Sequence, residues 1–100
     1  MDRKAVPLVA MRERIADGSF VQVVIWNVPA PVRGSNHHFK YSLALVVDET
    51  CVLRYDNEAG KGDHRHVGNA ETSYQFSGLD QLQRDFVLEA RSWLIENGRD

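Results

Sequence analysis

The sequence predicts an α+β domain in which a small antiparallel β-meander sheet is closed by a C-terminal α-helix. Three observations indicate this fold: short runs rich in β-branched and aromatic residues, tight-turn residues between these runs, and a final stretch with apolar residues at helical spacing. The chain has 100 residues, which is enough for one modest core. We therefore expect residues 1–100 to form a single domain.

The first two elements are expected to form a β-hairpin. Residues 8–15 fit either a strand or a helix, but Asp17 and Gly18 after them are typical of a tight turn. Residues 20–28 are β-branched and aromatic, which predicts a strand, so the segment before the turn is interpreted as a strand too. This second run is apolar on both faces, which indicates a central or doubly covered strand with Trp26 in the core.

The middle of the chain is expected to contain a loop and a second hairpin. Two prolines and a glycine predict a loop over residues 29–36, after which residues 39–47 restart a strand pattern. Residues 48–50 fit a short turn and residues 51–55 fit the returning strand, in which Cys51 is expected to be buried. Alternation places four apolar side chains of the strand before the turn on one face: Tyr41, Leu43, Leu45 and Val47.

The remaining segments lead to the clearest element, a C-terminal helix. The polar residues 56–62 predict a loop, and residues 64–67 and 73–76 are each expected to add a short strand. Ser77 is a suitable helix N-cap, and Gly98 is a natural helix stop. Between them, apolar residues recur at helical spacing: Leu79, Leu82, Phe86, Ala90, Trp93 and Leu94.

Composition limits the classes of function. Hydrophobic residues make up 43% of the chain and charged residues 26%, as in ordinary globular proteins. The formal net charge is −2, so any contact with nucleic acid must use a local basic patch. The single cysteine excludes an internal disulfide and fits a reducing compartment. No apolar run approaches the roughly 20 residues that span a bilayer, and the N-terminus lacks a signal-peptide pattern, so we expect a cytoplasmic protein without membrane contact.

The residues that can carry chemistry gather in the polar segment 54–66. This segment combines two glycines with acids, bases and half of the four histidines. In an extended chain His64 and His66 share one face, and Arg65 projects from the other. Two histidines on one face can act as an acid–base pair, bind a metal ion or, with neighbouring lysine and arginine, surround a phosphate.

A second group of residues, at the start of the strand 39–47, is expected to lie beside this segment. If this strand pairs with the following one as a hairpin, Lys40 and Tyr41 lie beside Tyr55 and Asp56. All four histidines then fall at one end of the sheet. Whether the two adjacent histidines before the strand join the site depends on strand register, which a slip of one residue reverses.

These residue types fit metal-independent cleavage of RNA. In that reaction a base removes the proton of a 2′-hydroxyl, the resulting oxygen attacks the adjacent phosphate, an acid protonates the leaving oxygen, and a cation stabilises the developing negative charge. His64 and His66 are expected to be base and acid, Tyr55 an acid or a stacking surface, and Gly60 and Gly62 positions where backbone N–H groups approach the phosphate. No cofactor or metal ion is needed. The candidate catalytic residues are His64, His66, Lys61, Tyr55 and Asp56. The candidate substrate-binding residues are Arg65, Lys40, Tyr41, Arg54, Gly60 and Gly62.

Three other interpretations stay open from the residues alone. A metal-dependent nuclease would use Asp56, Glu58 and Asp63 as ligands, although their spacing matches no standard metal motif. A non-enzymatic interaction module would bind a partner protein or nucleic acid through Lys61, Arg65 and Lys40. A polar segment rich in Gly, Asp and Asn is also commonly no more than a solvated turn.

Several motifs resemble the TumE-type toxins of bacterial toxin–antitoxin pairs. The matching residues are Asp17-Gly18-Ser19-Phe20, Val24-Ile25-Trp26, His38-Phe39-Lys40-Tyr41 and, most specifically, Tyr55-Asp56-Asn57-Glu58-Ala59-Gly60-Lys61-Gly62-Asp63-His64-Arg65-His66. The resemblance continues through Tyr74-Gln75-Phe76 to the helix with Asp85-Phe86. It implies a small toxin encoded beside a cognate DNA-binding antitoxin, similar in size and context to ribonuclease toxins that stop translation. RNA is the substrate expected from the site residues, and an antitoxin is the partner that an interaction module would bind. One departure, Asp48-Glu49-Thr50 without a glycine, affects the turn more than the chemistry.

Overall fold

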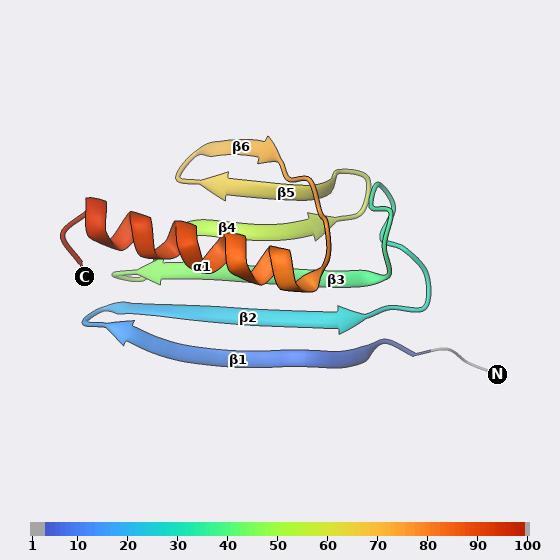
Figure 1. Ribbon diagram of the computed structural model, residues 1–100, viewed down its shortest axis with the longest axis horizontal. Helices are drawn as coiled ribbons and strands as arrows, with labels where there is room; N and C mark the ends of the chain where they lie inside the picture. Colours follow the sequence, from blue (N-terminus) through green and yellow to red (C-terminus); the bar gives the residue numbers. More distant parts are fainter. Residues whose placement is uncertain (1–3, 100) are drawn as a thin grey trace.

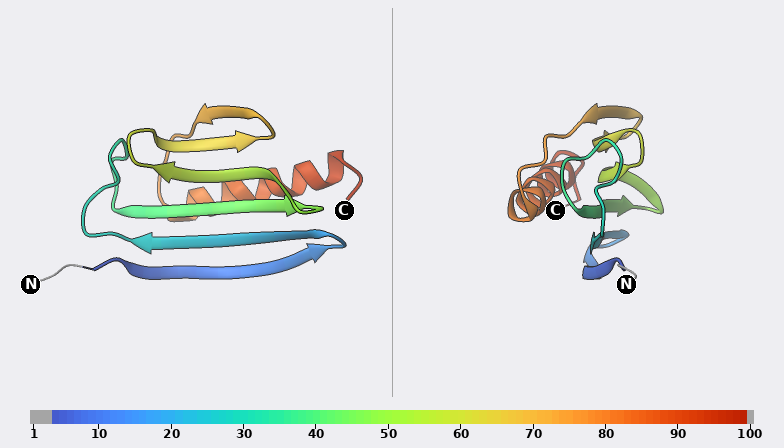
Figure 2. Two further views of the ribbon diagram at one scale, coloured as in Figure 1. Left: turned by 180° about the vertical axis from the view of Figure 1, so that it is seen from behind. Right: turned by 90° about the vertical axis from the view of Figure 1, so that its right-hand side faces the viewer.

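A computed structural model describes residues 4–99 and confirms the predicted α+β fold. Six antiparallel strands follow one another in chain order across a single sheet, and one helix packs on one face of it (Figure 1 and Figure 2). The elements are β1 (Val6–Ala16), β2 (Ser19–Asn27), β3 (Phe39–Val47), β4 (Thr50–Glu58), β5 (Gly62–Val67), β6 (Ala70–Ser73) and α1 (Leu79–Glu96). We call the side of the sheet that carries α1 the helix face and the opposite side the open face.

The core lies between α1 and the middle of the sheet. Strand alternation turns every second side chain of β2, β3 and β4 toward the helix, as the sequence pattern predicted for β3. The buried apolar residues are Val23, Ile25, Tyr41, Leu43, Leu45, Val47, Leu53 and Tyr55 from the sheet and Leu82, Phe86, Ala90 and Leu94 from the helix. Leu79 and Trp93 belong to the predicted apolar stripe of the helix, but they are only partly buried at the margin of this core.

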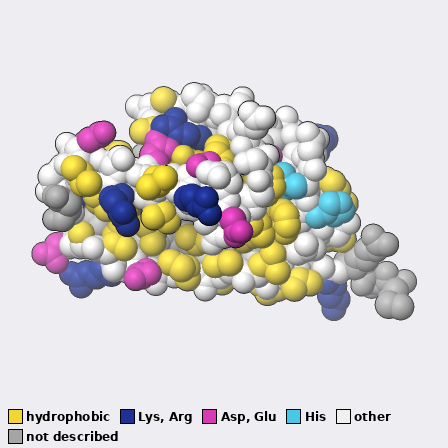
Figure 3. Space-filling model, in the orientation of Figure 1, with side chains coloured by type: hydrophobic (Ala, Val, Ile, Leu, Met, Phe, Trp, Pro, Cys, Tyr) yellow, Lys and Arg dark blue, Asp and Glu magenta, His cyan; other side chains and the backbone are white. Residues whose placement is uncertain are grey.

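The helix does not cover the whole helix face. Over β1 and β2 it leaves an apolar groove of about 400 Å³ whose lining includes Met11, Ile15, Val23, Val87 and Leu94. Figure 3 shows apolar side chains gathered on this part of the surface. Within residues 4–99, no helix has both the length and the hydrophobicity that crossing a lipid bilayer requires.

Two strand boundaries differ from the prediction. The expected loop 56–62 is shorter, because β4 continues to Glu58 and pairs with β5 through Asp56↔His64 and Asn57↔Asp63. This backbone ladder outweighs the low strand propensity of Asp and Asn. The expected strand 73–76 is also wrong, since β6 ends at Ser73 and the chain then turns toward α1.

Three local predictions are wrong for identifiable reasons. Gly78, not Ser77, is the N-cap residue of α1, and no side chain caps the helix there. Trp26 is 37% exposed, because β2 is central in the sheet but only one of its faces is covered. Cys51 is exposed near the β3–β4 turn. Gly98 follows the C-cap residue Asn97 with φ +68°, so the predicted helix stop is confirmed.

Candidate functional site

The β4–β5 hairpin places the two predicted histidines on the open face. In the ladder, Arg54 pairs with His66 and Asp56 pairs with His64, so these four side chains project from the same side of the sheet. The two imidazole rings have centroids 6.4 Å apart and an interplanar angle of 33°. Their side chains are 17% and 22% exposed, so both rings are sheltered but in contact with solvent.

A carboxylate holds His66 in place. His66 Nε2 lies 3.2 Å from Asp56 Oδ1, so a proton on Nε2 is donated to that carboxylate. Arg54 Nε lies 3.1 Å from the other oxygen, Oδ2, as an ion pair without the alignment of a hydrogen bond. Nδ1 of His66 has no hydrogen-bond partner among the described residues.

His64 is oriented by its own backbone neighbourhood. Its Nδ1 lies 3.0 Å from the carbonyl oxygen of Gly62, which can only accept, so the proton of the neutral ring is on Nδ1. Nε2 is then a lone-pair acceptor, 3.6 Å from Oε1 of Glu71. Lys61 Nζ lies 3.5 Å from the same oxygen, and the side chain of Lys61 is 54% exposed. Thus each imidazole has one nitrogen fixed and one nitrogen available.

A second histidine–carboxylate pair lies at the same end of the sheet but on its other side, the helix face. His37 Nε2 is 2.7 Å from Asp63 Oδ2, and the hydroxyl of Tyr41 donates to the same oxygen at 2.7 Å. The hydroxyl of Ser35 donates to the other oxygen of Asp63. The backbone N–H of Phe39 donates to His37 Nδ1 at 3.2 Å, so both ring nitrogens of His37 are engaged. We call Ser35, His37, Tyr41 and Asp63 the buried cluster.

Burial defines this cluster. The side chains of His37 and Asp63 are only 11% and 8% exposed. The ring of His37 stacks on Phe76, in the segment that follows β6, with centroids 3.7 Å apart. Burial, followed by the hydrogen bond to Asp63, raises the pKa of Tyr41 far above its usual range.

The loop between β2 and β3 is held against the β4–β5 hairpin by backbone and amide contacts. Asn57 is fully buried; its Nδ2 donates to Phe39 O at 2.6 Å and its Oδ1 accepts from Tyr41 N at 3.0 Å. Gly62 adopts φ +75°, and a Cβ there would lie 2.5 Å from the carbonyl oxygen of Gly34. The N–H of Gly60 donates to Arg33 O at 2.8 Å, so this amide is engaged within the protein.

Three of the predicted site residues lie on the helix face, away from the two open-face histidines. Tyr41 belongs to the buried cluster, and the hydroxyl of Tyr55 donates to Glu89 of α1. Arg65 binds both carboxylate oxygens of Glu89, as the alternation of β5 required. Burial raises the pKa of Tyr55, while burial of Glu89 is outweighed by hydrogen bonds from Arg65 and Tyr55, which lower the pKa of that carboxyl.

Three of the other predicted residues lie at the histidine pair: Arg54 and Asp56 share its face, and Lys61 lies in the adjoining turn. Lys40 lies two strands from β5, on β3, and donates to the backbone oxygen of Asn57. The expected position of Lys40 and Tyr41 beside Tyr55 and Asp56 is wrong by two residues, because the register places Ser42 opposite Asp56 and Leu43 opposite Tyr55. Asp56 and Asp63 project from opposite faces of the sheet, and in the described range 4–99 no three His, Cys, Asp or Glu side chains form a metal-binding group.

Sequence reasoning missed two members of this region. Glu71 lies on β6, which pairs with β5 through His66↔Glu71. The sequence prediction placed this last strand at residues 73–76, so it left Glu71 outside any strand. The pairing of His37 with Asp63 depends on the loop folding back over Gly62. Alternation does separate Asp63 from His64, and this signal was present in the sequence.

Comparison with known proteins gives one match. The family model described as Toxin TumE matches residues 5–94, which is nearly the whole chain. No curated protein and no solved structure shows significant similarity to the sequence.

Proposed function

Because the chain belongs to the TumE toxin family, we propose that it is a toxin that cleaves RNA by acid–base catalysis at His64 and His66 without a metal ion. The observation that carries the proposal is the pair of imidazoles on the open face, 6.4 Å apart between centroids, each with one nitrogen fixed and one available. A pair with this separation can reach both ends of one phosphodiester.

The two histidines have different surroundings, which support different roles for them. His64 holds its proton on Nδ1, so Nε2 is the base that removes the proton of the 2′-hydroxyl. The 2′-oxygen then attacks phosphorus, and the bond from phosphorus to the 5′-oxygen breaks. His66, protonated at Nδ1, donates that proton to the leaving 5′-oxygen, while Asp56 stabilises the imidazolium through Nε2. The products are a 2′,3′-cyclic phosphate and a 5′-hydroxyl.

Cationic side chains near the pair stabilise the charge that develops on the phosphate. Arg54 lies beside Asp56, and Lys61 lies beside Glu71, where it also offsets the repulsion between that carboxylate and a phosphate. Lys61 is the more exposed of the two, so it is the cation that reaches bound RNA most easily.

The family also implies a protein partner. Toxins of this kind are paired with an antitoxin, and we propose that the antitoxin of this chain is a DNA-binding protein encoded by the adjacent gene. Co-expression of that gene should restore growth to cells that express the toxin.

The test of the catalytic proposal is incubation of purified protein with RNA in the presence and absence of a chelator. We expect cleavage that the chelator leaves unchanged, with fragments ending in cyclic phosphate. His64→Ala and His66→Ala should each lower the rate about 100-fold or more, because acid–base catalysis contributes roughly 10²–10⁴. His38→Ala is the matched control, since His38 is an exposed histidine whose ring hydrogen-bonds to the backbone oxygen of Val28, away from the histidine pair.

The outcomes separate the alternatives. Full activity of the His64→Ala/His66→Ala double variant would refute the acid–base pair. Loss of cleavage with the chelator would favour a metal-dependent nuclease, and salt-sensitive binding to RNA without turnover would favour an interaction module.

A further inference from the structure

We infer that the part of the open face formed by β1, β2 and β3 binds the single-stranded RNA substrate next to the histidine pair. This inference rests on the proposed function for the identity of the ligand. The surface consists of Arg12 and Arg14 from β1, Phe20 and Trp26 from β2, and Lys40 from β3. We call it the basic–aromatic surface.

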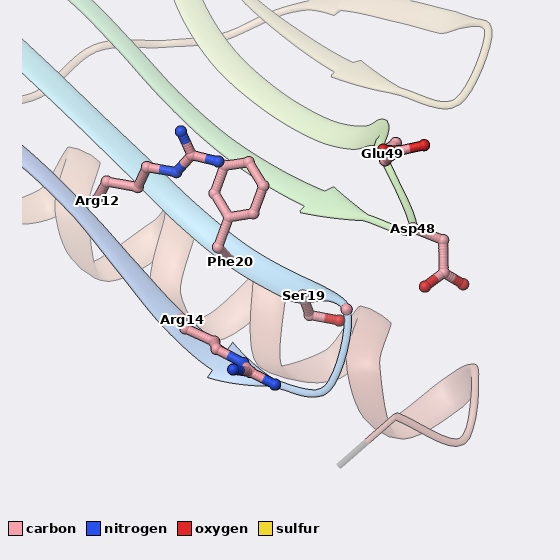
Figure 4. A pocket seen from close by; sticks show the side chains of 7 residues that line it. Arg12, Arg14, Ser19, Phe20, Asp48 and Glu49 are labelled. Carbon is pink, nitrogen blue, oxygen red and sulfur yellow. The ribbon is translucent and has the colours of Figure 1, made fainter.

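Strand register places these side chains together. The backbone position of Trp26 lies directly opposite that of Lys40, and Phe20 lies directly opposite Arg14. The ammonium of Lys40 is directed toward β4, where it donates to the backbone oxygen of Asn57. The guanidinium carbon of Arg12 lies 4.0 Å from the ring centroid of Phe20, a cation–π contact. Figure 4 shows this pair on the side of the sheet that faces the viewer, with α1 behind it.

Packing does not explain the two aromatic rings. The face from which they project carries no covering element in the described part of the chain, and Trp26 is 37% exposed. An exposed indole and a phenyl ring with a stacked guanidinium offer flat surfaces on which bases stack. The bases of a duplex have their faces hidden, so this chemistry selects unpaired RNA.

The charges of the open face are divided between its two halves. Within the described strands, the charged side chains that β1, β2 and β3 project onto this face are all basic, whereas Asp56, Glu58 and Glu71 project from β4 and β6. The acids nearest the basic half lie in turns. Asp48 is paired with Arg99, and Asp17 pairs with Arg14 while both side chains are highly exposed. Glu49, in the turn between β3 and β4, lines the same hollow as Arg12 and Phe20 (Figure 4). The basic half therefore complements the phosphates of a polyanion.

The surface is continuous with the histidine pair. Arg12, Gln22, Ala44, Arg54 and His66 occupy consecutive positions in one row across five strands. At about 4.8 Å between strands, Arg12 and Trp26 lie roughly 15–20 Å from the histidines, a span of several nucleotides. The β3 positions between them are short, Ser42 and Ala44, so no side chain there obstructs an extended strand.

The experiment measures binding rather than cleavage. The probe is a fluorescein-labelled unstructured 12-nucleotide RNA, titrated with the His64→Ala/His66→Ala protein, which removes the proposed cleavage. We expect tighter binding to this RNA than to a duplex of the same sequence. Trp26→Ala should weaken binding about 10-fold, because stacking contributes roughly 1–3 kcal/mol per base. Arg12→Gln should weaken binding and lower the salt dependence by about one phosphate contact.

The controls make each outcome decisive. Arg84→Gln removes one exposed positive charge from α1 on the other side of the molecule and should leave the affinity unchanged. The inference is overturned if both Trp26→Ala and Arg12→Gln bind the RNA with unchanged affinity, or if the protein prefers the duplex. If Trp26→Ala does not fold, the affinity of Arg12→Gln alone is the test. Binding that depends on Trp26 and Arg12 in a protein whose native form never cleaves RNA would sustain this inference and refute the proposed function.

Discussion

Two of the histidine–carboxylate pairs in the described part of the chain, His37–Asp63 and His66–Asp56, differ in how many of their ring nitrogens are engaged. In the buried cluster, His37 Nε2 lies 2.7 Å from Asp63 Oδ2, and both side chains are about one-tenth exposed. Both ring nitrogens of His37 have hydrogen-bond partners. On the open face, His66 Nε2 lies 3.2 Å from Asp56 Oδ1, and these two side chains are about twice as exposed as those of the buried pair. One ring nitrogen of His66, Nδ1, is available.

The same two residue types therefore serve different ends. An imidazole whose two nitrogens are both bonded cannot exchange a proton with a substrate unless one of these bonds breaks. The buried cluster then acts on stability, because it fastens the β2–β3 loop to β3 and β5. The open-face pair contributes little to stability, and its available nitrogen is what the proposed chemistry requires.

The largest expected effect separates the two carboxylates. Asp63→Ala removes the acceptor for Ser35, His37 and Tyr41, and leaves these buried donors unpaired, so it should lower the free energy of unfolding by about 3–5 kcal/mol. Asp56→Ala should lower it by about 1 kcal/mol or less, because its ion pairs are partly solvated. Urea denaturation of both variants provides the measurement. Equal losses would contradict the distinction between the two pairs.

A smaller effect tests how the loop is fastened. Gly62→Ala places a Cβ 2.5 Å from the backbone oxygen of Gly34 at φ +75°, so loop and hairpin must move apart; we expect a loss of about 2–3 kcal/mol. Gly68→Ala is the matched control, because Gly68 has φ +56° but no atom within 4 Å of the added Cβ. It should cost only about 1 kcal/mol, the penalty of the left-handed backbone alone. Similar losses in both would show that loop contact at Gly62 is unimportant.

The same contrast explains what the sequence predicted well. Alternation and helical spacing are local, so they predicted the hairpins, the core face of β3 and the apolar stripe of α1. They also placed His64 and His66 on one face and Arg65 on the other. The predicted loop over 56–62 was too long, because pairing between β4 and β5 is decided by the partner strand rather than by local propensity.

Local sequence patterns could not predict contacts between segments that are distant in the chain. The hydrogen bond between His37 and Asp63 joins residues 26 positions apart in the chain. It requires the backbones of Gly34 and Gly62 to pack directly against each other. The exposure of Trp26 depends on the absence of a covering layer over one face of β2, which an apolar run cannot reveal. Both features depend on how the strands, the loop and the helix are arranged in space, which no local pattern specifies.

The smallest expected effect concerns the alkaline stability of the buried cluster. Burial and the hydrogen bond to Asp63 raise the pKa of Tyr41 in the folded protein far above the ordinary tyrosine value of 10.0. Above about pH 10 the unfolded chain loses this proton while the folded chain keeps it, so the contribution of Tyr41 is present below that pH and falls as pH rises. The slope associated with one such group is about 1.4 kcal/mol per pH unit. Tyr41→Phe should remove this slope while lowering stability at neutral pH by about 1 kcal/mol through loss of the hydrogen bond.

Denaturation of the native protein and Tyr41→Phe between about pH 9 and 11 measures this difference. The burial-raised pKa values of Tyr55 and Tyr74 give the variant a residual alkaline slope, so the informative quantity is the change in slope between the two proteins. Asp56→Asn is the control from the open-face pair. The charge of Asp56 is the last and smallest of the causes that raise the pKa of Tyr41, so removing it should leave that pKa well above this pH range and the alkaline slope of the native protein intact. A Tyr41→Phe protein with an unchanged slope would mean that the Tyr41 hydroxyl is not buried against Asp63, and the contrast between a locked and an available histidine pair would lose its structural basis.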